Sequence, residues 1–380
     1  MVDFRYSEEQ KALVETARRF AREKIVPIAA ECDRQARFPM DVFELAWQIG
    51  LVNVTCPARY GGAGMGHLDN ALIAEELAYG CSGIQASIQA NQLALAAVGL
   101  AGQEEQKQKY MGILTRGPTM ASLATTEPDA GSDVAGIRTR FTRHGDAYVI
   151  TGQKAWITNA SYARFYIVFA TEDPALRHKG IAAFIVDRDL RGVSVGNKEN
   201  KVGQRASDTR TLHLDDVQVP ASNLLAPPPH GFKLAMECFN QTRPDIGAAS
   251  AGLMRRALDE SIGYARDRKA FGVPIAEHQL VQAMIAEMAI RYEAARLLYQ
   301  KAASDLDQGV RDPMVSSFAK AFGADAAMQT AVDAVQVFGG NGCAADYPVE
   351  KLMRDAKILQ IYEGTSQIQR LVIARRLLAR

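Results

Sequence analysis

Neither sign of charge is in excess in this chain of 380 residues. Its 44 lysines and arginines nearly cancel its 43 aspartates and glutamates, so no overall field attracts nucleic acid or anionic lipid. Basic runs such as "ARRFAREK" at 17–24 carry interleaved apolar residues, a pattern that favours solvated helix faces over a nucleic-acid patch. The charge pattern therefore predicts a small-molecule partner or a local one.

Cysteine, histidine and long apolar runs are also scarce. The five cysteines are far apart and form no CxxC pair, and the six histidines form no HExxH, so neither a disulfide framework nor a metal site is predicted. No uninterrupted apolar run approaches the roughly 18 residues that a membrane span needs. The chain begins directly with an amphipathic helical pattern and shows no targeting segment. We expect a cytoplasmic protein that is not inserted in a membrane.

Glycine-rich stretches are present, but none is a nucleotide fingerprint. "RYGGAGMGH" at 59–67 does not fit GxGxxG and joins two helical patterns, and no GxxxxGK[ST] occurs. "VFGGNG" at 337–342 predicts the end of a helix. "TTEPDAGSDVAG" at 125–136 predicts a turn whose small residues leave backbone N–H groups free to face an anion.

The periodicity of the apolar residues divides the chain into three parts. Helical spacing holds over about 7–115, short β-branched and aromatic runs follow over about 119–220, and long helical patterns such as 277–306 continue to the end. We predict an α+β multi-domain fold with helical, β and helical domains at 1–117, 118–226 and 227–380. The proline run 227–229 is the predicted linker, and C-terminal helices with several apolar faces suggest a bundle that packs against partner subunits.

Long stretches in a fixed order carry a resemblance along essentially the whole chain. They include "FAREKIVPIAAECD", "TEPDAGSDVAGIRT", "GQKAWITNA", "TRPDIGAASAGL" and "QVFGGNGCAADYPVEKLMRDAKILQIYEGTSQIQR". Together they resemble the acyl-CoA dehydrogenase family, most closely its medium-chain members. The resemblance implies an N-terminal helical domain, a central β-sandwich or barrel-like domain and a C-terminal four-helix bundle. It also implies bound FAD and a homotetramer built as a dimer of dimers.

The activity implied by the resemblance is the α,β-dehydrogenation of a saturated short- or medium-chain acyl-CoA to the trans-2-enoyl-CoA in fatty-acid β-oxidation. Electron-transfer flavoprotein would accept the electrons. A processed eukaryotic form would reside in the mitochondrial matrix. Three alternatives stay open: an oxidase that reduces dioxygen, a dehydrogenase for branched or alicyclic acyl groups, and a non-catalytic assembly protein.

The acid in "IYEGT" at 361–365 is Glu363, which by resemblance is the catalytic base. We expect Gly364 to end one helix, and Ser366 with Gln369 stand at capping-box spacing in the next. The helix N-terminus should lower the pKa of Glu363, whereas burial should raise it and dominate. Without the resemblance, Glu363 reads as a carboxylate that merely stabilises a helix dipole.

Some relatives carry the base on the helix after the β domain. That stretch here reads "MECFNQTRPD". It holds no carboxylate around "NQTRP" before Asp245, and Glu237 is out of register. The resemblance therefore leaves Glu363 as the predicted base.

The resemblance also assigns binding residues. Those expected to contact FAD are Thr126, Gly131, Ser132, Trp156, Thr158, Arg268, Phe271, Gln279, Gln336, Gly339, Gly340, Thr365 and Gln367. Those expected to contact the substrate are Ser132, Asn240, Arg243 and Arg375 for CoA, and Tyr362, Gly364, Gln85 and Gln89 for the acyl group. Several of the FAD contacts are expected to reach across a subunit interface. The family polarises the thioester carbonyl with the backbone N–H of the base residue and a ribityl hydroxyl of FAD.

Three positions depart from the family pattern. Asp129 stands where the motif has glycine, Asn240 where close relatives have aspartate, and Gln89 where the medium-chain members have an acid toward the bottom of the acyl pocket. A buried neutral amide at position 89 needs hydrogen-bond partners. These departures leave the preferred acyl chain open.

Overall fold

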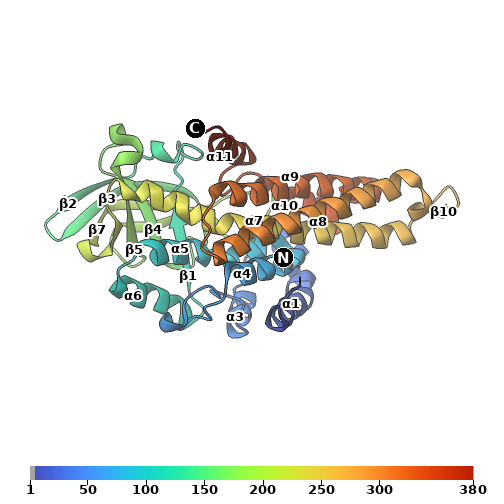
Figure 1. Cartoon of the computed structure of the whole chain (residues 1–380), viewed down its shortest axis with the longest axis horizontal. Helices are drawn as coiled ribbons and strands as arrows, with labels where there is room; N and C mark the ends of the chain where they lie inside the picture. The colour runs from blue at the N-terminus through green and yellow to red at the C-terminus, as the bar shows by residue number, and fades with distance from the viewer. Residues whose placement is uncertain (1–4, 380) are drawn as a thin grey trace.

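The computed structural model describes residues 5–379 and shows helices, then a sheet, then a long helical bundle (Figure 1). The predicted order of the three parts is confirmed, and so is the fold class. Within the described residues, no helix is both long and apolar enough to cross a membrane.

The N-terminal helices pack beside the start of the bundle. They are α1 (Glu8–Phe20), α2 (Ala29–Arg34), α3 (Met40–Gln48), α4 (His67–Gln89), α5 (Asn91–Ala101) and α6 (Glu104–Thr115). The glycine-rich stretch before α4 is a loop, as predicted. Asp307 at the end of the bundle helix α8 (Gln279–Asp307) accepts hydrogen bonds from the N–H groups of His67 and Leu68, at 2.6 and 3.0 Å. This contact anchors the first turn of α4 to the bundle.

The central part is one eight-stranded sheet. Its strands are β1 (Met120–Ala124), β2 (Arg140–His144), β3 (Ala147–Thr158), β4 (Ala163–Thr171), β5 (Ile181–Asp187), β6 (Val193–Lys198), β7 (Thr209–Pro220) and β8 (Leu224–Ala226). They run in the order β6-β7-β3-β2-β4-β5-β8, and β1 pairs with β4 in parallel.

Strand β4 explains the sandwich-like form, because both of its faces are buried. Tyr166 and Val168 share a core with residues of β2, β3, β5 and β7, so the sheet folds over itself. Phe165 and Ile167 point the other way and join the core formed with α5, α6 and the start of the bundle. The sheet is therefore fixed against the helices that carry the cavity described below.

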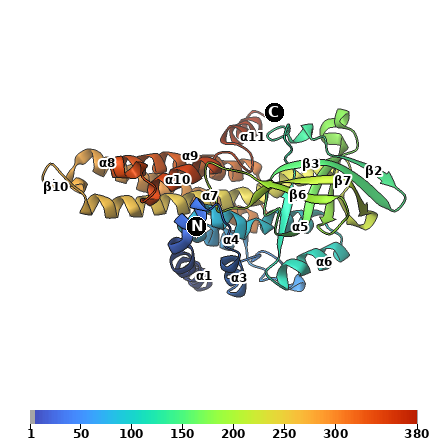
Figure 2. The same cartoon turned by 180° about the vertical axis from the view of Figure 1, so that it is seen from behind.

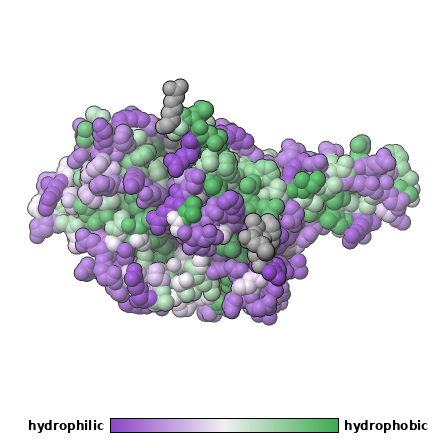
Figure 3. Space-filling model, viewed as in Figure 1, coloured by the Kyte–Doolittle hydropathy of each residue, from purple (hydrophilic) through white to green (hydrophobic). Residues whose placement is uncertain are grey.

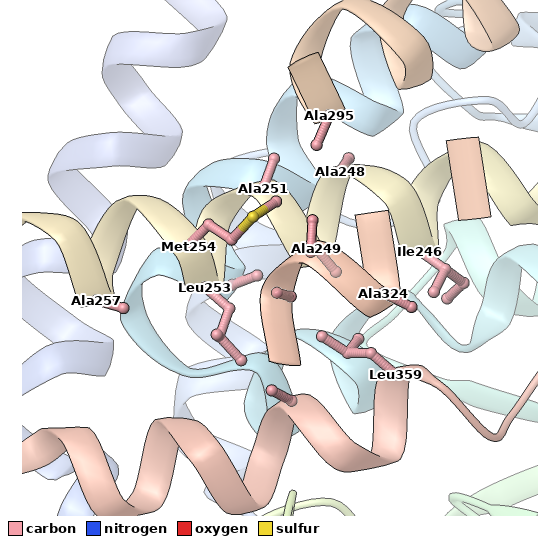
Figure 4. Close-up of a cluster of buried hydrophobic side chains, with 14 of the residues drawn as sticks. Ile246, Ala248, Ala249, Ala251, Leu253, Met254, Ala257, Ala295, Ala324 and Leu359 are labelled. Carbon is pink, nitrogen blue, oxygen red and sulfur yellow. The ribbon is translucent and has the colours of Figure 1, made fainter. Parts of the chain in front are cut away.

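The bundle is built on α7 (His230–Asp267), α8, α9 (Pro313–Phe338) and α10 (Pro348–Leu359), and α11 (Ser366–Leu378) lies against α9. Alanines of α7 such as Ala248 and Ala251 lie in its core with Ala295 of α8 and Ala324 of α9 (Figure 4). Small side chains let the helix backbones approach closely, which favours a stiff bundle. The proline run lies between β8 and α7, as predicted.

A short hairpin of β9 (Lys269–Ala270) and β10 (Val273–Pro274) joins α7 to α8. It lies at the far end of the bundle, away from the sheet, in both views (Figures 1 and 2). Helix α11 lies at the other end, beside the sheet. The long axis of the molecule therefore separates the hairpin from the sheet.

A cluster of buried charges joins α4, α7 and α8. Arg255 donates to Glu76 at 2.5 Å and to Glu75 at 3.2 Å. Glu75 also accepts hydrogen bonds from Tyr292, at 2.8 Å, and from Tyr299. Both carboxylates are buried, so each depends on these donors for its stability.

Candidate active site

The loop at 360–365 between α10 and α11 holds Glu363 in an unusual conformation. Glu363 and Gly364 have φ of +52° and +87°, and left-handed backbone costs a residue other than glycine roughly 1–2 kcal/mol. The side-chain amide of Gln369 donates to the carbonyl oxygens of Glu363 and Gly364, at 3.2 and 2.9 Å. These contacts hold the strained turn and fix the direction of the Glu363 side chain.

The predicted helix boundaries at this loop were wrong by a few residues. Helix α10 ends at Leu359, so Gly364 does not end a helix. The N-cap of α11 is Thr365, whose hydroxyl accepts from the N–H of Ile368 at 3.2 Å. Since Thr365 takes the cap position, Ser366 becomes the first helical residue and Gln369 is free to bond the loop carbonyls instead of completing a capping box.

The Glu363 carboxyl is bonded to α7. The Thr242 hydroxyl donates to Glu363 Oε2 at 2.7 Å. Burial raises the pKa of Glu363 to about 7, and the Thr242 hydrogen bond, Arg243 and Lys320 oppose that rise. Desolvation dominates, as expected, and a carboxyl that titrates near neutral pH is suited to take and release a proton.

Two buried cations lie close enough to influence Glu363. Lys320 of α9 is fully buried, and its Nζ has no hydrogen-bond partner among the described residues. Burial lowers the pKa of Lys320 to about 8, and Glu363 opposes that change. Arg243 is also buried, with Nη1 donating to Asn240 Oδ1 at 2.7 Å and Nε unpartnered. Each cation favours the ionised form of Glu363.

The backbone N–H of Glu363 is also available. Within residues 5–379 it donates to no backbone or side-chain acceptor, whereas the N–H of Ile368 in the next helix is capped by Thr365. An unoccupied N–H beside a carboxylate can bind a ligand carbonyl in the position where the carboxylate would attack the adjacent carbon.

Thr242 also lines a cavity of about 310 Å³. Its walls come from the loop before α4, from α4, α5 and α6, and from α7, and its apolar side includes Leu95, Leu100 and Met111. This volume is at the lower end of the roughly 300–1,000 Å³ of small-molecule pockets. The cavity is one hydrogen bond away from Glu363, through the Thr242 hydroxyl.

Gln85 and Gln89 lie on the second half of α4, beyond a break in the helix at Cys81, and both are buried. Gln85 donates to Gln89 at 2.7 Å, and Gln89 donates to the Oδ1 and backbone oxygen of Asn70, at 3.2 and 3.1 Å. The expectation that the amide at position 89 finds partners is confirmed. Neither residue lines the cavity directly, so they support its wall.

One group of predicted cofactor residues lies on the sheet. Thr126 and Thr158 are half-buried, Gly131 and Ser132 are exposed, and Trp156 is 56% exposed with φ of +61°. Trp156 and Thr158 lie on β3. The turn at 125–136, which contains Thr126, Gly131 and Ser132, is stabilised by a buried ion pair, Lys154 to Glu127 at 2.7 Å. Glu127 also accepts from the N–H groups of Arg138 and Thr139. The predicted turn is confirmed.

The other group lies at the far end of the bundle. Arg268, Gly339 and Gly340 line a second cavity of about 300 Å³. Phe271 in the hairpin is 96% exposed, and Gln279 and Gln336 are exposed on α8 and α9. Helix α9 ends at Phe338, so the predicted stop at "VFGGNG" is confirmed. Because the sheet lies at the opposite end of the molecule (Figure 1), one chain does not bring the two groups together.

The remaining predicted residues lie in the Glu363 loop, on α11 and in the turn at 125–136. Tyr362 accepts from Gln204 at 3.3 Å, and burial raises its pKa. Gly364 is half-buried, and Gln367 and Arg375 are exposed on α11. Asp129 is exposed and lies 3.7 Å from Arg138.

Sequence reasoning missed three residues of this site. It gave no role to Thr242, which lies inside a quoted motif, and named Asp245 only as the first carboxylate after "NQTRP". Lys320 was not considered, although it is the one charged residue in the small and apolar stretch "SSFAKAFGA" at 316–324. A lone cation in such a stretch indicates a buried charge, and that signal could have identified it.

Comparison with known proteins covers nearly the whole chain. Three family models match in order, described as the N-terminal domain, the middle domain and the C-terminal domain of acyl-CoA dehydrogenase, over residues 7–118, 122–217 and 229–378.

Individual relatives agree with these matches. A probable medium-chain specific acyl-CoA dehydrogenase 2, mitochondrial, of Caenorhabditis briggsae is 48% identical over 99% of this chain and 92% of its own. Cyclohexane-1-carbonyl-CoA dehydrogenase of Geobacter metallireducens is 43% identical over 99% of both chains. The structure of butyryl-CoA dehydrogenase from Megasphaera elsdenii superposes with a TM-score of 0.97 at 34% identity, over 99% of this chain and 100% of that one.

Proposed function

This chain belongs to the acyl-CoA dehydrogenase family of FAD-dependent oxidoreductases, and we propose that it converts a saturated short- or medium-chain acyl-CoA to the trans-2-enoyl-CoA with Glu363 as base. The observation that carries this proposal is the Glu363 carboxyl, which has a pKa near 7 and accepts a hydrogen bond from Thr242 in the lining of a substrate-sized cavity. Such a group is ionised often enough to remove a proton and basic enough to keep it.

In the proposed reaction, ionised Glu363 takes the proton from the α-carbon of the acyl group. Thr242 holds the carboxylate oxygen through its hydroxyl, and the strained loop sets the direction of attack. Arg243 and Lys320 favour the carboxylate before the transfer. The free backbone N–H of Glu363 donates to the thioester carbonyl, where negative charge develops as the proton leaves.

FAD, when bound, supplies the acceptor for the hydride from the β-carbon. The residues of this chain fit such a group on two surfaces. A side chain at Gly131, Gly339 or Gly340 would meet open space, so these backbones are accessible to a ligand. Thr125 Oγ1, beside Thr126, is buried without a partner. We assign the sheet group (Thr126, Gly131, Ser132, Trp156 and Thr158), together with Thr365 and Gln367, to one face of FAD.

The group at the bundle end completes the site from a second subunit in this proposal. Arg268 suits a pyrophosphate because its planar fork donates two bonds at once, and it lies with Gly339 and Gly340. We assign Phe271, Gln279 and Gln336 to the same surface. Phe271 and Leu280 are 96% and 82% exposed, and apolar patches cover this end of the molecule (Figure 3). Since solvent-exposed aromatics of this kind favour an interface, we propose a homotetramer made of two such dimers.

We place the CoA part of the substrate along α7 and α11. Arg243 and Asn240, which are hydrogen-bonded to each other at 2.7 Å, would form one contact with CoA. Ser132 on the sheet and Arg375 on α11 are exposed and free to meet the rest of CoA. Tyr362 and Gly364 flank the thioester, and the acyl chain enters the cavity beyond Thr242, whose wall Gln85 and Gln89 support.

We further propose that the physiological electron acceptor is electron-transfer flavoprotein and that the pathway is fatty-acid β-oxidation. The proposed location is the cytoplasm, or the mitochondrial matrix for a processed eukaryotic form. The Geobacter relative is named for an alicyclic substrate, cyclohexane-1-carbonyl-CoA, so an alicyclic acyl-CoA is the second candidate substrate of this chain. An oxidase would release peroxide at the rate at which it turns over acyl-CoA. An assembly protein would show no acyl-CoA turnover.

An anaerobic titration tests the proposal. FAD-loaded protein is mixed with saturated acyl-CoA esters from butyryl to dodecanoyl, and bleaching of the flavin spectrum is followed by stopped flow. Glu363→Gln should slow bleaching at least about a hundredfold, the lower end of general-base contributions, while still binding enoyl-CoA. Glu237→Gln, an acid on the preceding turn of α7, is the matched control and should bleach like wild type.

Equal bleaching by wild type and Glu363→Gln would place the base elsewhere. A loss in Glu237→Gln alone would favour the alternative position on α7. No bleaching by any ester in the series would refute the proposed substrate class.

A further inference from the structure

The cavity next to Glu363 has a polar wall that a plain hydrocarbon chain does not need. Besides its apolar residues it is lined by Thr55, His67, Asn70, Gln92 and Asp245. If the proposed function holds, this is where the acyl chain ends, so the inference that follows rests on that function. The polar wall then bears on which acyl chain is accepted.

Asp245 is the central feature of this wall. It follows Thr242 by three residues on α7, so the two side chains share a helix face about 4.5 Å apart along the axis. Asp245 is buried, at 8% exposure, and no described lysine, arginine or histidine lies within ion-pair distance. Burial raises its pKa well above the usual range, against a hydrogen bond from Asn70. Burial thus favours the protonated form of the carboxyl, which can both donate and accept a hydrogen bond.

The amides around Asp245 are already committed to one another. Asn70 Oδ1 accepts from Gln92 at 2.7 Å and from Gln89 at 3.2 Å. Gln92 Oε1 accepts from Thr55 at 2.7 Å. Asp245 lines the same cavity, and none of these hydrogen bonds occupies its carboxyl, so a methyl end would leave hydrogen-bonding capacity of that carboxyl unused.

The charges around the cavity determine which polar group the end of an acyl chain can carry into it. A carboxylate would have to lose its hydration in this cavity, where the one arginine of the lining, Arg311, is exposed. An ammonium group would have to lose its hydration beside a protonated carboxyl. It would also be repelled by Arg311 at the exposed rim and by Arg243 and Lys320 near Glu363. Burial lowers the pKa of His67, so that side chain is neutral as well. An uncharged donor and acceptor meets neither penalty.

We propose that this enzyme prefers a short acyl-CoA whose chain ends in a hydroxyl group, bonded by Asp245 at the polar wall of the cavity. The volume of about 310 Å³ and the single helical turn between Thr242 and Asp245 restrict the chain to a few carbons beyond the reacting pair. Plain hydrocarbon chains of the same length still fit, but they leave Asp245 without a ligand partner.

The test compares six-carbon esters on the FAD-loaded holoenzyme: hexanoyl-CoA, 6-hydroxyhexanoyl-CoA, 6-aminohexanoyl-CoA and adipyl-CoA. The readout is kcat/KM for anaerobic flavin reduction, with the corresponding four-carbon pair as a second length. Wild type should favour the hydroxy ester over the plain one at least tenfold at one of the two lengths. Asp245→Leu should lose this preference and gain on the plain ester, whereas Asp245→Asn should keep most of it.

A wild-type preference for the plain, amino or carboxy ester at both lengths would overturn the inference, and so would an unchanged ratio in Asp245→Leu. The wild-type comparison decides even if a variant does not fold. Oxidation of plain esters with no advantage for the hydroxy ester would leave the proposed function standing and remove only the inference. No flavin reduction by any ester would remove both.

Discussion

Replacing Thr242 by valine removes the hydroxyl that donates to Glu363 Oε2 at 2.7 Å and keeps the shape of the side chain. The hydrogen bond stabilises the ionised carboxylate, so its loss should raise the pKa of Glu363 above the present value of about 7. A hydrogen bond to a charged group contributes roughly 1.5 kcal/mol, which corresponds to roughly one pH unit.

The sign of the activity change follows from the form of Glu363 that reacts. Only the ionised carboxylate removes a proton, so kcat/KM in wild type should rise roughly tenfold between pH 6 and pH 8. In Thr242→Val the same rise should come roughly one pH unit later. At pH 7 the ionised fraction falls from about one half to about one tenth, so the variant should be roughly fivefold slower there.

The assay is the pH dependence of kcat/KM for anaerobic flavin reduction by the fastest saturated acyl-CoA, from pH 5.5 to pH 9.5. Thr242→Ser is the matched control, because serine keeps the hydroxyl and should keep the wild-type midpoint. Two profiles that rise at the same pH, with a uniform loss in the valine variant, would show that Thr242 acts through packing. A flat wild-type profile would refute the assignment of a neutral-range carboxyl as base.

Three further predictions concern other parts of the molecule. Lys320→Met removes a buried cation that favours ionised Glu363, so the midpoint of the same pH profile should move up and the unfolding temperature should not fall. Arg268→Ala should weaken FAD binding by the apoprotein at least about tenfold, as measured by fluorescence titration. Glu75→Ala leaves Arg296 without a buried carboxylate partner and Arg255 with Glu76 alone, and it should lower the unfolding free energy by roughly 3–5 kcal/mol in urea denaturation.

Two of these variants have matched controls. Lys269→Ala, an exposed neighbour of Arg268, should bind FAD normally, and equal losses in both variants would contradict a specific role for the arginine. Glu8→Ala removes an 86% exposed partner of Lys11 and should change stability by less than about 1 kcal/mol. A small effect at Glu75 would mean that water replaces the lost carboxylate. An unmoved midpoint in Lys320→Met would show that this cation is too distant to act on Glu363.

Much of the fold followed from local patterns alone. Apolar spacing separated the helical parts from the β part, because the periods of helix and strand differ along the chain itself. The turn at 125–136 and the stop at "VFGGNG" were predicted correctly, since glycine and proline act on their own backbone. The cap of the helix after Glu363 was predicted one residue too late, because Thr365 and Ser366 are both good caps and only the packed loop decides between them.

The sequence by itself determined the family and the position of Glu363, since both rest on residues that are contiguous or in a fixed order. Only the tertiary structure decided what surrounds that carboxyl. Thr242 lies 121 positions away, and Lys320 and Asp245 come from two helices that meet near Glu363 only after the bundle forms. Desolvation, ion pairing and cavity shape depend on distances in space, and no local pattern along the chain encodes them.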